Sequence, residues 1–144
     1  MPEIIPIGAD HAGFELKERL KQELAALGYE PLDLGTHSAD STDYPDYAHP
    51  VASQVEGGQV RRGVLLCGTG LGMAYAANRH PGVRAAVAWT PEVAKLARAH
   101  NDANVLVLPA RFVTEQEGIE ILRTWLATPF EGGRHQRRVQ KIEP

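Results

Sequence analysis

The residues best placed to do chemistry form the segment from Cys67 to Gly72, which reads Cys-Gly-Thr-Gly-Leu-Gly. It follows the apolar run 64–66 and precedes the helix-favouring segment 73–79, so it predicts a buried strand, a tight turn and a helix. Glycines let the backbone approach a ligand closely, and a helix N-terminus favours an anion, a developing oxyanion or a thiolate. The pattern is therefore typical of a site that uses the thiol of Cys67.

The same residues also have a simpler interpretation, because a lone cysteine at a strand end is often a small buried apolar side chain. Three related motifs are excluded. A Walker loop needs Gly-Lys-Ser/Thr, which is missing here. A dinucleotide fingerprint needs glycine, and a cysteine phosphatase loop needs arginine, at the position that Met73 occupies.

Whole-chain properties narrow the class of protein. The 144 residues are 43% hydrophobic and 23% charged, as in an ordinary globular domain. With a net charge of -3, nucleic acid is not an expected partner, and no apolar run approaches the length of a membrane span. The six histidines and one cysteine show no metal-ligand spacing, so no metal is expected. The single cysteine excludes an internal disulfide and residues 1–6 lack a basic leader, so we expect a cytoplasmic protein.

Hydrophobic periodicity predicts alternating strands and helices along the chain. Strands are expected near residues 4–8, 30–34, 64–67, 83–88 and 105–108, with a helix after each except the second, which a polar loop separates from a helix over 46–55. The helix after Thr90 should carry Val93, Leu96 and Ala97 on its apolar side. Thr114 and Glu117 form a capping box for the last predicted helix.

This alternation predicts an α/β fold, a single-domain three-layer doubly wound sandwich with a five-stranded parallel sheet. Residues 1–144 form one domain, in which residues 131–144 are a basic C-terminal tail. The expected strand order is the flavodoxin-like 2-1-3-4-5, which places the switch point between the first and third strands. The loops after these strands should bring Asp10, His11, Cys67 and Thr69 into one crevice. Alternatively, Asp10 only caps a helix and His11 lies on the surface.

Two further polar segments of the chain are candidates for function. His100-Asn101-Asp102-Ala103-Asn104 connects a helix to the fifth strand, where a histidine also suits the helix dipole. Residues 131–138 are locally basic in an acidic protein. They are either a solvated terminus or a phosphate-binding segment that Arg111 could join, because guanidinium groups match phosphate oxygens.

Together these residues identify a family resemblance that covers essentially the full chain. The motifs that carry it are Asp10–Gly13, Asp43-Tyr44-Pro45, Cys67–Gly72, Ala76-Ala77-Asn78, His100–Asn104 and Gly132–Arg138. In this order and at these spacings the chain resembles the type B ribose-5-phosphate isomerases, a family that also includes galactose-6-phosphate isomerase subunits.

The resemblance implies interconversion of ribose 5-phosphate and ribulose 5-phosphate through an enediolate, without a metal or organic cofactor. It implies that Cys67 is the general base and that Thr69 hydrogen-bonds its thiolate. Backbone N–H groups across Gly68, Gly70, Leu71 and Gly72 would hold the enediolate oxygens. One branch of the family uses a glutamate six residues after the cysteine position, but Met73 occupies it here, so only Cys67 can be the base.

The other site residues also follow from the resemblance. His100 matches the acid that opens the furanose ring, with Asp10 as a possible partner. The matching phosphate and sugar contacts are His11, Arg134, Arg138, Asn101, Arg111 and Tyr44. Some relatives carry an uncharged residue in place of Arg137, which either binds phosphate or faces solvent. Family members are homodimers or homotetramers with shared active sites, and some receive the equivalent of Arg111 from the neighbouring subunit.

Two alternative functions stay open at this stage. A hexose 6-phosphate isomerase, acting on allose or galactose 6-phosphate, would use the same chemistry in a roomier pocket. A non-catalytic flavodoxin-like module could bind a phosphate or nucleotide in the same crevice. A binding module needs arginines but has no use for Cys67 and His100, and their presence favours the isomerase.

Overall fold

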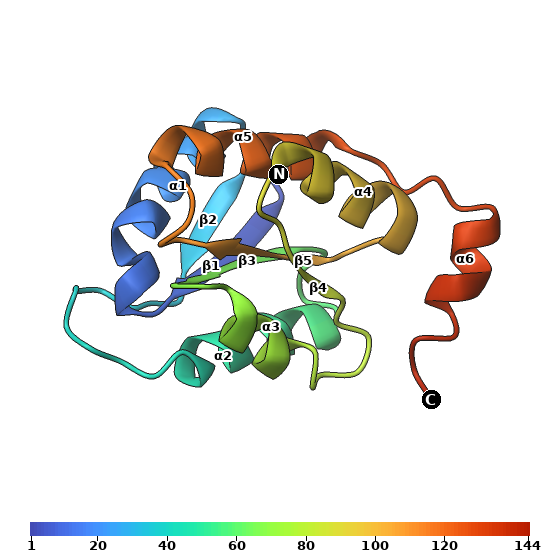
Figure 1. Ribbon diagram of the computed structural model, residues 1–144, viewed down its shortest axis with the longest axis horizontal. Coiled ribbons are helices and arrows are strands. Elements are labelled where there is room, and N and C mark those ends of the chain that lie inside the picture. The colour runs from blue at the N-terminus through green and yellow to red at the C-terminus, as the bar shows by residue number, and fades with distance from the viewer.

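The computed structural model describes residues 1–144 and shows a five-stranded parallel sheet between two helical layers (Figure 1). The strands are β1 (Ile4–Ala9), β2 (Glu30–Asp33), β3 (Gly63–Cys67), β4 (Ala85–Val87) and β5 (Val105–Pro109). The helices are α1 (Phe14–Ala26), α2 (Pro45–Glu56), α3 (Leu71–Ala77), α4 (Pro91–Asn101), α5 (Glu115–Ala127) and α6 (Arg134–Val139), with a 3-10 turn η1 (His11–Gly13) before α1. The predicted α/β class is confirmed.

The predicted order of the last two strands is wrong, because the sheet runs β2-β1-β3-β5-β4. β5 is buried at every residue and pairs with β3 along its whole length, from Val105 opposite Gly63 to Pro109 opposite Cys67. β4 has only three residues, all partly exposed, and lies at the edge. An inner strand of a parallel sheet must be apolar on both faces, and β5 fits that position better than β4.

The switch point is still between β1 and β3, because the chain moves outward from β1 to β2 and then crosses back to β3. The connections therefore leave on opposite faces of the sheet. In Figure 1, α1, α4 and α5 cover one face, while α2 and α3 cover the other. The ends of β1 and β3 open between these layers.

Each face of the sheet has its own apolar core, because side chains alternate along every strand. Leu66 and Leu108 pack with Trp125 of α5 on one face. Leu65, Cys67 and Val107 pack against α2 and α3 on the other. The side chain of Cys67 thus belongs to the α2–α3 face, which fixes the side of the sheet from which it can be reached.

The predicted helix caps are formed, but the buried face of one helix differs from the prediction. The Thr90 hydroxyl accepts a hydrogen bond from Val93 N at 3.2 Å, and the capping box of α5 is formed. On α4, however, Val93 and Leu96 are 41% and 42% exposed, while the small residues Ala94 and Ala97 are buried. α4 therefore presents an apolar stripe to solvent within the single chain.

α6 and the C-terminus stand away from the sheet beside the end of α4 (Figure 1). The predicted basic tail, residues 131–144, therefore contains the helix α6. None of the helices combines the length and the apolarity that crossing a bilayer requires.

Candidate active site

The loops that follow β1 and β3 meet at the switch point, as the sequence predicts. Asp10 N donates to Leu66 O at 3.3 Å, which joins the end of β1 to the end of β3. A Cβ on Gly13 would lie 2.6 Å from Leu66 Cβ, so only glycine lets the start of α1 pack this closely on β3. These contacts hold Asp10 and His11 beside the Cys67 loop.

Asp10 is 6% exposed, and its carboxylate caps the turn that follows it. Oδ1 accepts hydrogen bonds from Ala12 N at 3.0 Å and Gly13 N at 3.3 Å. The capping interpretation is therefore confirmed for Oδ1, and only Oδ2 remains for another partner.

His11 connects the crevice to the polar loop that precedes α2. Its Nδ1 accepts a hydrogen bond from Thr42 N at 3.2 Å, which leaves Nε2 without a partner in the chain. Thr42 was not anticipated from the sequence, and its buried hydroxyl has no hydrogen-bond partner. The loop before α2 therefore holds the His11 ring through the backbone of Thr42.

Cys67 ends β3 with 5% of its surface exposed. Its carbonyl accepts from Ala110 N at 2.9 Å, and the carbonyl of Gly68 accepts from Arg111 N at 3.0 Å. The turn after β5 therefore holds the start of the Cys67 loop in place. It also brings Arg111 over this loop, because a Cβ on Gly68 would lie 3.1 Å from Arg111 Nη1.

The loop has the free donors that an oxyanion site needs. Gly68, Thr69 and Gly70 lie between β3 and α3, and their N–H groups donate to no other group of the chain. Leu71 N instead donates to Thr69 Oγ1 at 3.2 Å, so it contributes less than the sequence suggests. The exposed Thr69 hydroxyl keeps its own proton available for donation.

Gly70 and Gly72 have distinct structural reasons to be glycine. Gly70 has φ +79°, in the left-handed region, and a Cβ there would meet Val87 and Val107 at 3.1 and 3.2 Å. A Cβ on Gly72 would lie 2.6 Å from the Tyr44 ring. Tyr44 therefore lies against the loop that follows Cys67.

The predicted residues His100 and Asn101 lie at the opposite end of the strands from Cys67. His100 and Asn101 end α4, just before β5 begins opposite the first residue of β3. Cys67 lies at the other end of these paired strands, four residues from Gly63, or about 13 Å away at about 3.3 Å per residue. The suggested pairing of His100 with Asp10 is therefore not formed within one chain.

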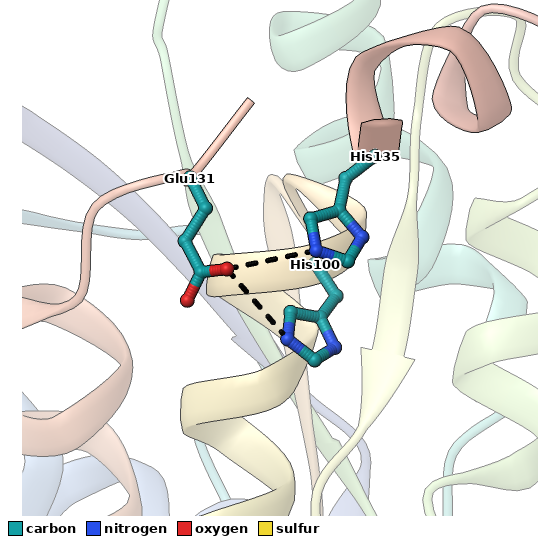
Figure 2. Close-up of side chains that lie close together, drawn as sticks. All are labelled: His100, Glu131 and His135. Atoms are coloured by element: carbon teal, nitrogen blue, oxygen red, sulfur yellow. Dashed lines mark ion pairs between the residues drawn. The ribbon is translucent and has the colours of Figure 1, made fainter. Parts of the chain in front are cut away.

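A second cluster forms around His100 instead (Figure 2). Its ring stacks on that of His135 of α6, with centroids 4.2 Å apart and planes 11° from parallel. Glu131 Oε1 lies 3.8 Å from His100 Nε2 and 3.5 Å from His135 Nε2. Burial, then the charges of His100 and Arg134, lower the pKa of His135.

Glu131 and His135 were missed as functional candidates. Glu131 and His135 are four residues apart in the sequence, which was the only hint that they could act together. Their contact with His100 depends on how α6 packs beside α4. Their ligand atoms and that of His100 are close enough to consider a metal ion. A metal bound to imidazole lies in the ring plane, within about 2.1 Å of nitrogen, so two stacked, nearly parallel rings do not point at one ion.

The arginines divide into paired and unpaired groups. Those with a carboxylate partner are Arg19, Arg61, Arg62, Arg84, Arg98 and Arg123. Arg111, Arg134 and Arg138, the three predicted phosphate ligands, form no ion pair in the chain, and neither do Arg79 and Arg137. Arg111 belongs to the Cys67 end of the sheet, and the α6 arginines belong to the His100 end.

Fold and site together define a parallel α/β protein that has a thiol-containing crevice at its switch point and a separate histidine–arginine cluster. A sequence profile described as Ribose/Galactose Isomerase matches residues 5–142. Ribose-5-phosphate isomerase B of Escherichia coli K12 is 47% identical over 138 residues, which cover 96% of this chain and 93% of that protein. The chain therefore belongs to the ribose/galactose isomerase family.

Solved structures agree with this assignment. A ribose 5-phosphate isomerase from Thermotoga maritima superposes with a TM-score of 0.95 and 51% identity, covering 98% of this chain and 97% of that chain. Ribose-5-phosphate isomerase B from Mycoplasma genitalium, solved with bound ribulose-5-phosphate, gives a TM-score of 0.94 and 44% identity, covering 99% and 95%.

Proposed function

We propose that this enzyme interconverts ribose 5-phosphate and ribulose 5-phosphate through an enediolate, with Cys67 as the general base. The observation that carries the proposal is the thiol at the end of β3, followed by three consecutive free N–H groups. Such donors stabilise negative charge on oxygen, and a positioned base next to them can abstract a proton from the adjacent carbon. The names of the relatives supply the substrate.

The proton transfer needs no external reactant. The Cys67 thiolate removes the proton from C2 of the open-chain aldose, the electrons of that C–H bond form the C1–C2 double bond, and O1 carries the negative charge. The thiol then returns the proton to C1, and the O2 hydroxyl proton ends on O1. The amides of Gly68, Thr69 and Gly70 hold the enediolate oxygens, and the Thr69 hydroxyl donates to the thiolate.

Ring opening comes before this step, because ribose 5-phosphate is mainly a furanose. His100 protonates O4 as the C1–O4 bond breaks, and the proton of O1 leaves to a base, for which Asp10 Oδ2 is our candidate. His11, Arg134 and Arg138 bind the phosphate, with Arg111 beside them. Asn101 contacts a sugar hydroxyl, and Tyr44 closes the crevice over Gly72.

These roles require two copies of the chain, because Cys67 and His100 lie at opposite edges of one sheet. We propose a homodimer, or a homotetramer built from it, in which the His100 end of one copy completes the Cys67 crevice of the other. Support comes from α4, where Val93, Leu96 and His100 share one exposed helix face. A second copy would cover this apolar stripe and carry His100 with it. The expected cytoplasmic location stays a prediction.

The test is ketose formation from ribose 5-phosphate, measured beside allose 6-phosphate, in the wild type and in Cys67→Ala. We expect turnover of the pentose, at least about a hundredfold lower in the variant, as is usual for a lost general base. Affinity for the pentose should stay within a few-fold. Turnover of the hexose alone would keep the mechanism and change the substrate. Unchanged turnover in Cys67→Ala would refute the mechanism, and binding without turnover in the wild type would favour the non-catalytic module.

A further inference from the structure

The cluster around His100 contains two side chains that a ring-opening acid does not itself require. A proton donor for ring opening needs one imidazole, yet a second ring stacks on it and a carboxylate oxygen approaches both Nε2 atoms (Figure 2). The three side chains come from α4, the segment before α6 and α6 itself. Glu131 N also donates to Ala99 O at 3.0 Å, which fixes the carboxylate residue to the end of α4.

The stacking of the two rings disfavours a positive charge on both at once. Two stacked imidazolium rings 4.2 Å apart would repel each other, while a neutral ring can stack on a charged one. The charged groups that face His135 are His100, Glu131, Arg134 and Arg138. Burial and the neighbouring cations lower the pKa of His135. Glu131 Oε1 lies 3.8 Å from His100 Nε2, where its negative charge can attract and orient a protonated His100 ring.

We propose that His135 and Glu131 are positioning residues that hold the His100 ring in a fixed orientation and keep its proton in place for opening the furanose. This inference rests on the proposed function and extends it. His135 supplies a flat, uncharged surface, and Glu131 supplies the negative charge. Neither needs to touch the substrate.

A positioning role for His135 and Glu131 makes a specific kinetic prediction, because only the reaction that starts from the aldose must open a sugar ring. Ribose 5-phosphate closes through O4 and must be opened. Ribulose 5-phosphate cannot form a five-membered ring, since its O5 carries the phosphate, and so it binds in the open-chain form. Exchange of its C1 hydrogen with solvent deuterium needs the Cys67 step but not ring opening. Positioning variants should therefore lose turnover of the aldose while they keep exchange into the ketose.

The experiment compares His135→Ala, His135→Phe and Glu131→Gln with Gln136→Ala, an exposed control on the same helix. For His135→Ala we expect kcat on ribose 5-phosphate to fall at least about tenfold, the scale of a misplaced catalytic group, with KM and the deuterium exchange rate within about twofold. His135→Phe keeps a flat, neutral ring and should retain most of the turnover. In Glu131→Gln kcat on ribose 5-phosphate should also fall while the exchange rate stays within about twofold, because the negative charge that faces His100 Nε2 at 3.8 Å is gone.

The outcomes separate this proposal from the one on which it rests. A wild type without isomerase activity would refute the proposed function. Normal wild-type turnover with an unchanged kcat on ribose 5-phosphate in both His135→Ala and Glu131→Gln would refute only the positioning role. Parallel loss of turnover and exchange would also overturn it, since the pair would then act on folding or on the enediolate step. If EDTA inactivated the wild type, and Zn²⁺ restored it but not Glu131→Gln, the cluster would be a metal site instead.

Discussion

Complementation between two inactive variants gives the most direct test of the shared site. Within one chain, Cys67 lies at the carboxyl end of β3, and His100 lies before the first residue of the paired strand β5. The strand length alone separates them by about 13 Å. The carbons and the ring oxygen on which these groups would act are neighbours in one small sugar, so both groups must come within hydrogen-bond distance of it.

The expected recovery follows from counting sites. In a two-fold symmetric dimer, each site takes Cys67 from one copy and His100 from the other. Random re-pairing of equal amounts of Cys67→Ala and His100→Ala makes about half of the dimers hybrids, and each hybrid has one fully native site and one doubly altered site. The mixture should therefore regain about a quarter of wild-type activity, while each parent alone has about one hundredth or less.

The assay is ketose formation from ribose 5-phosphate after subunit exchange, with the mixed dimers identified by a tag on one variant. The matched control mixes wild type with the double variant Cys67→Ala/His100→Ala. Each hybrid then contains two singly altered sites, so activity should fall from about one half to about one quarter of that of pure wild type as exchange proceeds.

Two results would refute this reasoning. One is a set of verified hybrids no more active than their parents. The other is a control mixture that stays at one half of wild-type activity after exchange is complete. Either result would mean that Cys67 and His100 act in the same chain, which the strand geometry does not allow without moving the end of α4.

Three further predictions concern other parts of the site and its support. Gly72→Ala places a Cβ 2.6 Å from the Tyr44 ring and should lower kcat/KM about tenfold with little change in melting temperature, and an unaltered kcat/KM would show that this ring position is not needed. Burial raises the pKa of Asp33, but hydrogen bonds from two lysines and a backbone amide more than offset this and bring the pKa from 3.8 to about 2. Because the folded-state pKa is depressed, the stabilisation is full above pH 3.8 and is lost as the pH falls toward about 2. Asp33→Asn should therefore cost about 2 kcal/mol in urea unfolding at pH 7, and a penalty that does not shrink in acid would point to packing alone. Arg134→Ala should raise KM for ribose 5-phosphate at least about tenfold and hardly affect binding of unphosphorylated ribose, with Arg137→Ala measured beside it, and equal losses on both sugars would make Arg134 structural.

Much of the fold could be predicted because its signals are local. The capping box at Thr114 and the glycine turn after Cys67 each depend on a few adjacent residues. The order of β4 and β5 could not be read this way, since it depends on which strand better tolerates burial on both faces. The sequence 105–109 is apolar throughout, and it is this property, rather than its place in the chain, that gives β5 the inner position.

The separation of the site into two parts could have been deduced without the structure. In a parallel sheet, the loops that follow strands lie at the carboxyl ends of the strands, and the loops that precede strands lie at the opposite, amino ends. His100 precedes β5 and Cys67 follows β3, so they cannot meet within one chain. The stack of His100 on His135 is a different case, because it depends on how α6 packs beside α4, and the sequence carries no periodic signal for that contact.

The orientation of α4 connects the fold to the chemistry. A helix with Val93, Leu96 and Ala97 should turn its larger apolar side chains inward, yet it buries Ala94 and Ala97 and exposes the other two. Burial of a Val or Leu side chain gives about 1.5–3 kcal/mol, which this helix does not gain in the isolated chain. An association that covers Val93 and Leu96 would gain it, and His100 lies on the same helix face one turn further on. The same contact that stabilises two copies would therefore deliver the acid to the partner's thiol, so that assembly and catalysis would depend on one helix surface.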